Sequence, residues 1–387
     1  MPNKTLVISE VFPPIHGGSG RWLYELYRRL PKDDYIIAAG ITLGDNEFDT
    51  SSELNIIRLP LSSKSWGLIS NDGIHLYINN FFIIRRLIKQ HNITRIHCSR
   101  CLPEGVFGFL FKKLNRIPYI CFVHGEEIET ASTSKELTYI VNAVLKNSSV
   151  LIANSKNTKQ ILIKQWYISP NKIHVLHPGM DSSRFIPAEP DILIRNALGW
   201  NNRPVILTVG RLQKRKGHDI LLQALPIIIK KYPNILYAII GDGEEKDNLL
   251  SLVDYLSIKY NVQLLSNVSD EKMIQCYQQC TLFILPNRTV GKDIEGFGMV
   301  LAEAQSCGKA VIAGDSGGTA ETMIIGKTGY VVDCTTPTPI ANEVIKLLSN
   351  SETLHTMGVQ ARQHAIANLD WSIHTKVALS IFDTLET

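Results

Sequence analysis

Several kinds of segment are missing from this 387-residue sequence. No apolar stretch reaches the length that a membrane-spanning helix needs. The apolar run in MPNKTLVISEVFPP is too short for the core of a signal peptide. We find no internal repeat, low-complexity tract or nucleic-acid-binding motif. We therefore expect a cytoplasmic globular protein, either soluble or held peripherally on the inner face of a membrane.

The seven cysteines form neither a C-x-x-C pair nor a His/Cys cluster with the spacing of a zinc site. An odd number of scattered thiols is typical of a reducing compartment, where most cysteines are buried structural residues. We therefore expect no structural metal and no disulfide framework.

Charge is sparse and unevenly distributed. Hydrophobic residues make up 44% of the chain and charged residues 20%, which indicates a globular protein. The net charge is only +4, but the part up to Glu189 has 22 Lys and Arg against 16 Asp and Glu. This excess predicts an anionic partner, such as a phospholipid surface or a phosphorylated acceptor. Basic residues scattered over a solvated surface are the alternative.

Short apolar runs alternate with helical patterns in two series, which predicts two α/β domains with parallel sheets. The strands of the first series are expected at residues 5–9, 35–39, 55–59, 95–98, 119–123 and 150–153. Those of the second are expected at 205–209, 236–240, 263–265, 282–285, 310–313 and 329–332. The segment from about Arg184 to Pro204, with three prolines, is interpreted as the linker. Two Rossmann-like domains would face each other across a deep cleft at the carboxyl ends of their strands.

The segment Glu295-Gly-Phe-Gly-Met-Val-Leu-Ala-Glu303 follows a predicted strand and a polar loop. Gly296 and Gly298 would let backbone amides approach a ligand, and the helix that starts near Gly298 would direct its positive end at it. The carboxylates of Glu295 and Glu303 suit the hydroxyl groups of a sugar. A plain strand-loop-helix connection with a surface glutamate is the alternative.

This segment resembles the E-x7-E signature, in its EGFG form, of the retaining GT-B glycosyltransferases of family 4. Further motifs follow in the order of that family. They are Gly17-Gly18 after the first strand, His124-Gly125 with Glu127, Gly210-Arg211-Leu212 with Lys216-Gly217, Gly241-Asp242-Gly243, and Gly317-Gly318-Thr319-Ala320-Glu321. The loop from Pro286 to Glu295 is similar to that of bacterial phosphatidylinositol-mannoside mannosyltransferases. His177-Pro-Gly-Met-Asp181 departs from the usual Asn-Gly-Val-Asp.

The resemblance implies an acceptor domain over residues 1–190, joined by a C-terminal helix at 370–387, and a donor domain over 200–369. Arg211 and Lys216 would bind the diphosphate of a nucleotide-sugar and stabilise its growing charge. Neighbouring Lys214 and Arg215 are interpreted as solvated charges, and Arg288 as part of a flexible surface loop. Glu303 would bind ribose, while Glu295 and His124 would contact the transferred sugar. The remaining donor-binding positions are Gly17, Gly18, Gly210, Gly243, Gly296, Phe297, Gly298, Met299 and Val300.

The family resemblance also predicts the chemistry. No Asp-x-Asp occurs, so we expect a metal-independent hexosyltransferase that requires no cofactor. GDP-mannose is the favoured donor and a UDP-sugar the next. The acceptor would be a glycan or a lipid-linked molecule of envelope polysaccharide or glycolipid synthesis. The departing phosphate would take the acceptor proton, and no protein nucleophile is required.

The sequence fits other functions less well. An NAD(P)-dependent oxidoreductase is disfavoured because no G-x-G-x-x-G follows the first strand, and no carboxylate follows the second. A catalytically silent nucleotide-sugar-binding homologue, a GT-B epimerase and a phosphorylase remain alternatives.

Two apolar segments with basic ends, Phe81–Lys89 and Val106–Lys113, suit either a helix packed on a sheet or a helix lying on an anionic bilayer. The packed helix is the favoured interpretation for both, and membrane docking remains a hypothesis.

Overall fold

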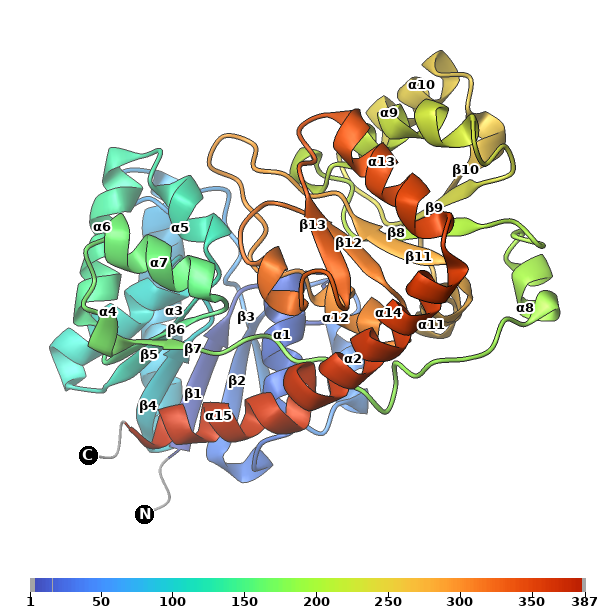
Figure 1. The fold of residues 1–387 in the computed structure, drawn as a ribbon. Coiled ribbons are helices and arrows are strands. Elements are labelled where there is room, and N and C mark those ends of the chain that lie inside the picture. Colours follow the sequence, from blue (N-terminus) through green and yellow to red (C-terminus); the bar gives the residue numbers. More distant parts are fainter. Residues whose placement is uncertain (1–3, 16, 385–387) are drawn as a thin grey trace. The chain divides into compact units, whose positions relative to one another are not determined.

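The computed structural model of the chain describes residues 4–15 and 17–384. They divide into two compact units. The first runs to Pro178 and takes in the helix that begins at Trp371, and the second runs from Gly179 to Asp370. In each unit, helices flank a parallel sheet (Figure 1). The predicted α/β class with two Rossmann-like domains is confirmed.

The first sheet has the strand order β3-β2-β1-β4-β5-β6-β7. The strands are β1 (Lys4–Ser9), β2 (Tyr35–Gly40), β3 (Ile56–Leu59), β4 (Ile93–Cys98), β5 (Tyr119–Val123), β6 (Val150–Ala153) and β7 (Ile173–Val175). Every neighbouring pair is parallel. Strand β7 was not predicted, because three residues are too few for a recognisable pattern.

The second sheet has the order β10-β9-β8-β11-β12-β13 and is also parallel throughout. Its strands are β8 (Val205–Val209), β9 (Leu236–Ile240), β10 (Val262–Leu265), β11 (Leu282–Leu285), β12 (Val311–Gly314) and β13 (Gly329–Val332). In both sheets the direction of winding reverses next to the first strand. Ligands of open α/β sheets bind at such a reversal, at the carboxyl ends of the strands.

The helices of the first unit are α1 (Gly18–Tyr27), α2 (Asp45–Ser51), α3 (Asn71–Gln90), α4 (Glu104–Asn115), α5 (Glu126–Ala131), α6 (Lys135–Asn147), α7 (Lys156–Lys164) and α15 (Trp371–Asp383). Those of the second are α8 (Ile192–Ala197), α9 (His218–Ile229), α10 (Lys246–Tyr255), α11 (Asp270–Gln279), α12 (Met299–Ser306), α13 (Pro337–Leu348) and α14 (Ser351–His364).

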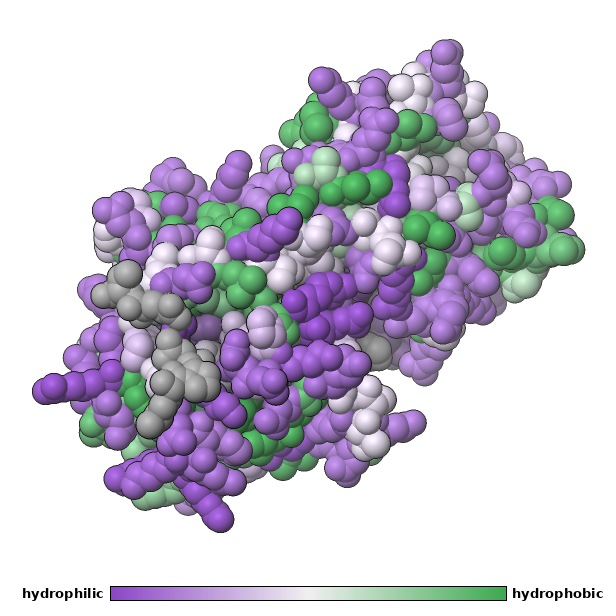
Figure 2. Space-filling model, turned by 90° about the horizontal axis from the view of Figure 1, so that it is seen from below, coloured by the Kyte–Doolittle hydropathy of each residue, from purple (hydrophilic) through white to green (hydrophobic). Residues whose placement is uncertain are grey.

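Alternate residues of the buried strands pack on opposite faces of the second sheet. Ile206 of β8 packs with α9, α10 and α13, whereas Val205 and Leu207 pack with α11 and α12. Both faces are therefore apolar, as the continuous apolar runs in the sequence require. The molecular face drawn in Figure 2 is mostly hydrophilic, with its hydrophobic residues in small separate groups.

The segment 184–204 is not the linker that the sequence suggested. It belongs to the second unit and contains α8. Phe185 and Trp200 are 1% and 0% exposed, and the carbonyl of Phe185 accepts hydrogen bonds from Ser306 and Arg362. Buried side chains and hydrogen bonds therefore hold this proline-containing segment to the rest of the second unit.

Helix α15 returns the chain to the first unit. The Phe382 ring stacks on Tyr27 at 6.4 Å, and the Arg95 guanidinium donates to the Phe382 carbonyl at 3.5 Å. Residues 385–387 of the predicted C-terminal segment lie outside the described residues.

Candidate functional site

Two loops meet at the reversal point of the second sheet, between β8 and β11. One runs from Gly210 through a short 3₁₀ turn, Lys214–Lys216, into α9. The other runs from Pro286 to α12. The Arg288 amide donates to the Arg215 carbonyl at 2.8 Å, so the two loops are directly joined. This is where a nucleotide is expected in such a sheet.

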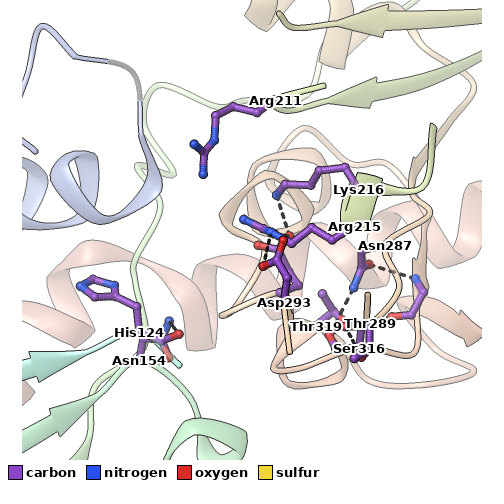
Figure 3. Close-up of polar contacts among 12 residues, drawn as sticks. His124, Asn154, Arg211, Arg215, Lys216, Asn287, Thr289, Asp293, Ser316 and Thr319 are labelled. Atoms are coloured by element: carbon purple, nitrogen blue, oxygen red, sulfur yellow. Dashed lines mark hydrogen bonds and ion pairs between the residues drawn. The ribbon is translucent and has the colours of Figure 1, made fainter. Parts of the chain in front are cut away.

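Four charged side chains form an ion-pair cluster across these loops (Figure 3). Both Nζ of Lys216 and Nη1 of Arg215 lie 2.6 Å from Oε2 of Glu295. Nε of Arg215 lies 3.0 Å from Oδ1 of Asp293. The first loop thus supplies two cations and the second supplies two carboxylates.

The cluster controls the ionisation of Glu295, which is 7% exposed. Burial by itself would raise the pKa of this carboxyl group, but Lys216 and then Arg215 outweigh burial and lower the pKa to about 2. Glu295 is therefore a carboxylate at every pH at which the protein would be assayed.

The interpretation of Arg215 as a solvated charge was wrong. Arg215 is only 4% exposed, and its guanidinium forms ion pairs with the carboxylates of Asp293 and Glu295. Lys214 is exposed, as expected. The sequence offered no sign of this, because its partners are about 80 residues away in the chain.

Arg211 does not join this cluster. Its residue is exposed, and its guanidinium has no hydrogen-bonding or ionic partner within residues 4–15 and 17–384. Figure 3 shows its side chain extending separately from that of Lys216. The two predicted phosphate-binding cations thus differ, because Lys216 is already paired with a carboxylate and Arg211 is available to an anion.

Hydrogen bonds hold the loop after β11 at several points, so the expectation that Arg288 lies in a flexible loop was wrong. Arg288 forms two hydrogen bonds with the carboxylate of Asp219 in the first turn of α9, at 2.7 and 2.8 Å. Asn287 is fully buried and binds the backbone of Ser316 and Gly314. These contacts hold the loop in the position that brings Glu295 to Lys216.

Two glycines set the backbone around Glu295. Gly298 caps α12 with φ +90°, a conformation that disfavours any residue with a Cβ atom. A Cβ atom at Gly317 would lie 1.7 Å from the Glu295 carbonyl oxygen, and the Gly318 amide donates to that oxygen at 3.0 Å. The Gly317-Gly318 element therefore holds the backbone of Glu295.

The remaining donor-side residues surround these loops. Gly296 and Phe297 are buried, Met299 and Val300 open α12, and Glu303 lies in its second turn. Oε2 of Glu303, a residue that is 2% exposed, accepts a hydrogen bond from the Tyr277 hydroxyl at 2.8 Å. Tyr277 was not predicted, and its contact fixes the direction of this carboxylate.

The Gly210 and Gly243 loops interlock at the ends of β8 and β9. The Leu212 amide donates to the Asp242 carbonyl at 2.9 Å, and the Glu245 amide donates back to the Leu212 carbonyl at 3.0 Å. A Cβ atom at Gly243 would lie 2.6 Å from the Leu212 carbonyl oxygen. The predicted glycine therefore permits close packing beside Arg211.

In the first unit, His124 follows β5 and is 8% exposed. Its Nε2 lies 2.8 Å from the carbonyl oxygen of Ser99, which can only accept, so Nε2 carries the proton. Burial is the main cause that lowers the pKa of His124 to about 4. At neutral pH the ring is therefore uncharged, and Nδ1 is left as an acceptor.

Neighbouring residues hold His124 in place. Its backbone amide donates to both carboxyl oxygens of Glu127, at 2.9 and 3.1 Å, and its carbonyl accepts from Asn154 at 3.0 Å. The Trp22 ring packs edge-on to the imidazole at 5.2 Å. Burial is the largest cause that raises the pKa of Glu127 to about 7. Glu127 thus binds the backbone of the His124 turn.

Helix α1 begins at Gly18, and Gly17 is its extended N-cap residue. The first backbone amides of a helix have no partner inside it, so they are available to an anion. Gly17 and Gly18, two of the predicted donor-binding positions, thus form the N-terminus of a helix that follows β1.

A pocket of about 530 Å³ after β3 contains none of the predicted site residues; it is lined by Pro60, Ser62, Ser63, Lys64, Asp72, His75, Leu76, Asn79 and Asn80. In the part of the chain that the structure describes, no three His, Cys, Asp or Glu side chains are placed to hold a metal ion.

Comparisons with known proteins identify the family of the chain. Residues 16–184 match the family model described as Glycosyltransferase Family 4, and residues 191–364 match the one described as Glycosyl transferases group 1. The chain is 31% identical over 374 residues to a GDP-mannose-dependent alpha-(1-6)-phosphatidylinositol monomannoside mannosyltransferase of Mycolicibacterium smegmatis. That match covers 95% of this chain and 94% of the relative. The chain belongs to glycosyltransferase family 4.

A second relative of this family 4 transferase is a GDP-mannose-dependent monoacylated alpha-(1-6)-phosphatidylinositol monomannoside mannosyltransferase of Corynebacterium glutamicum. It is 28% identical, with 96% of this chain and 95% of the relative covered. The predicted resemblance to phosphatidylinositol-mannoside mannosyltransferases is thus confirmed.

Solved structures give the fold of this family 4 transferase. HepE of Anabaena in complex with UDP superposes with a TM-score of 0.83 at 20% identity, covering 98% of this chain and 100% of HepE. Sucrose-phosphate synthase of Thermosynechococcus elongatus gives a TM-score of 0.81 at 18% identity, with 99% of each chain covered. Both confirm the GT-B fold.

Proposed function

We propose that this glycosyltransferase moves a hexose, with retention, from a nucleotide-diphosphate sugar to a glycan or lipid-linked acceptor of envelope polysaccharide or glycolipid synthesis. Mannose from GDP-mannose is the favoured donor group, because both mannosyltransferase relatives carry GDP-mannose in their names. A UDP-sugar is the next candidate. The observation that carries the proposal is the Lys216–Glu295 pair at the reversal point of the second sheet.

Charge is the main contribution of the second unit to the proposed reaction. When the bond from the sugar to the diphosphate breaks, negative charge grows on the departing phosphate. Lys216 and the available guanidinium of Arg211 would bind that charge, and the backbone amides of Phe297, Gly298 and Met299 at the start of α12 would add to it. We propose that these groups take the place of a divalent cation.

The carboxylates would orient the donor. Glu303, directed by Tyr277, would accept hydrogen bonds from the ribose hydroxyls, and Glu295 would accept them from the transferred sugar. Neutral His124 would offer Nδ1 to a hydroxyl of the same sugar. The departing phosphate would take the proton of the acceptor hydroxyl, so no side chain acts as a nucleophile.

Calorimetric titration with GDP, UDP and ADP in the presence of EDTA tests the donor site. We expect GDP to bind most tightly, and Lys216→Ala to weaken its binding about tenfold or more, because a charge-assisted hydrogen bond contributes about 1.5–3 kcal/mol. Lys214→Ala, which changes an exposed lysine of the same turn, is the matched control. Binding that appears only when Mg²⁺ or Mn²⁺ is added would contradict the metal-free site.

We also propose that α3 contacts an anionic membrane. Ile74, Ile78 and Phe82 are spaced four residues apart, so they share one face of the helix, and they are 36%, 52% and 63% exposed. Exposed basic residues follow at the C-terminal end of α3; they are Arg85, Arg86 and Lys89. An apolar face beside basic residues suits the surface of an anionic bilayer.

Helix α4, the second segment with an apolar run, does not share this property. Its apolar residues Val106, Phe107 and Phe111 are 6%, 0% and 0% exposed. The packed-helix interpretation is therefore correct for α4, and it also holds for the inward face of α3, where Ile84 and Leu87 are 0% and 8% exposed. In the described part of the chain, no helix has both the length and the apolar character to span a membrane.

Sedimentation with vesicles tests the contact through α3. We expect the protein to pellet with phosphatidylcholine vesicles that contain phosphatidylglycerol, and less without it. Replacing Ile78 and Phe82 by serine should weaken binding about tenfold or more, because each loses apolar surface that the bilayer would cover. Leu193→Ser, at a residue of α8 that is 76% exposed, is the control. Equal pelleting of the α3 variant and the wild type would rule out this surface.

A further inference from the structure

A second group of charged side chains lies at the reversal point of the first sheet, between β1 and β4. Glu10 follows β1, Arg100 follows β4, and Glu104 begins α4. Nη2 of Arg100 lies 2.5 Å from Oε2 of Glu10 and 3.3 Å from Oε1 of Glu104. The backbone amide of Glu10 also donates to Oε1 of Glu104, at 2.6 Å. Two carboxylates thus share one guanidinium.

The stability of the fold does not account for this group. Glu104 is 0% exposed, and the side chains of Glu10 and Arg100 are 12% exposed each. Burying such charges costs several kcal/mol per ion, which their attraction only partly offsets. In addition, Oε2 of Glu104 and Nε of Arg100 are buried without a partner among the described residues. Such a costly cluster is typical of a functional site rather than of a core that only stabilises the fold.

The group is tied to His124 through Ser99. The Ser99 hydroxyl donates to Oε1 of Glu104 at 2.7 Å, and the Ser99 carbonyl accepts the Nε2 proton of His124 at 2.8 Å. The cluster and the histidine therefore lie at neighbouring strand ends and share one residue. A molecule bound at Glu10 and Arg100 would be close to the imidazole that we place at the transferred sugar.

Both groups can reach a ligand. Oε2 of Glu10 binds Arg100, while Oε1 has no partner in the described part of the chain and is not among its buried, unsatisfied atoms. The Arg100 guanidinium lies over the Trp66 ring, 5.4 Å from its centroid, which fixes its plane. A carboxylate that accepts and a guanidinium that donates, side by side, match vicinal hydroxyl groups, which do both.

We propose that Glu10 and Arg100 form the acceptor subsite, and that they bind the hydroxyl groups of a cyclitol or sugar ring. Glu10 accepts a hydrogen bond from one hydroxyl and Arg100 donates one to its neighbour, while Glu104 holds both residues and Ser99. This inference rests on the proposed function, since it names the chemical class of the acceptor. It places the determinants of acceptor choice in the loops after β1 and β4.

Saturation-transfer NMR with myo-inositol and methyl α-D-mannopyranoside as probes tests the subsite. We expect the wild type to bind at least one of them, and Glu10→Gln to weaken that binding about tenfold or more, because a neutral amide accepts a weaker hydrogen bond than a carboxylate. Glu47→Gln, at an exposed glutamate of α2, should bind as the wild type does. Thermal unfolding reports whether each variant folds, and Glu10→Asp replaces Glu10→Gln if the latter does not.

The outcomes separate this inference from the proposed function. If the wild type binds GDP or UDP but neither probe, or if Glu10→Gln binds the probe as the wild type does, the subsite is wrong and the donor site stands. If no nucleotide binds while Glu10-dependent binding of a probe persists, the proposed transfer is wrong and the polyol site stands. Glu10→Gln should leave nucleotide affinity unchanged within about twofold, because Glu10 is not among the residues assigned to the donor.

Discussion

Lys216→Ala should lower kcat by on the order of 10²-fold or more, because it removes a cation that faces the charge growing on the departing diphosphate. The structure makes this variant informative. Arg215 stays bound to Glu295 and Asp293, so Glu295 keeps a buried partner and the second unit should still fold. Initial rates with GDP-mannose and UDP-glucose, measured by release of the nucleotide, would give the loss.

Lys214→Ala is the matched control for that measurement. Lys214 lies in the same 3₁₀ turn but is exposed, so its removal should leave kcat unchanged within about twofold. A Lys216→Ala enzyme that turns over at the wild-type rate would remove Lys216 from the mechanism. Arg211 would then be the only predicted phosphate-binding cation left.

Glu295→Ala should destabilise the second unit by about 3–5 kcal/mol, because it leaves Arg215 and Lys216 in a buried site without their shared carboxylate. The side chains of the two cations are only 5% and 12% exposed, so bulk water offsets little of the lost interaction. Urea unfolding at neutral pH would measure the difference. Glu295→Gln, which keeps an acceptor oxygen, should lose less stability than Glu295→Ala.

The pH dependence supplies a second test of the same residue. The pKa of Glu295 is lowered to about 2 in the folded protein, below its ordinary value of 4.5. A lowered carboxyl pKa stabilises the fold above the ordinary value, and this contribution is lost as the pH falls toward 2. The stability difference between wild type and Glu295→Ala should therefore be constant from pH 5 to 8 and shrink under acid. A difference that grows on acidification would contradict the ion pairs.

Much of the architecture follows from the sequence because buried parallel strands are continuous apolar runs. Six strands begin and end at the predicted residues; they are β5, β6, β8, β9, β11 and β13. Glycines such as Gly298 and Gly317 were recognisable for a related reason. A Cβ atom at either position would strain or obstruct the backbone, so these positions favour glycine and the motif can be recognised in the sequence.

The partners of the charged side chains were decided only by the tertiary structure. Arg215 and Lys214 are neighbours in the chain, yet one is buried between two carboxylates and the other is exposed. The same holds for Arg288, which binds Asp219 of α9. The attraction between two charges depends on their distance in space and not on their separation in the sequence. Its partner depends on which loops the sheet brings to one edge.

The protonation state of His124 likewise depends on a contact that the sequence does not show. The sequence by itself determined that a histidine and a glycine follow β5, and that the chain carries the ordered motifs of family 4. Only the tertiary structure placed the Ser99 carbonyl, from the end of β4, against Nε2 and so left Nδ1 as the acceptor. Local pattern determines where strands end, because backbone hydrogen bonding and burial act on short segments. The chemistry of a site depends on contacts between strand ends that are far apart in the chain.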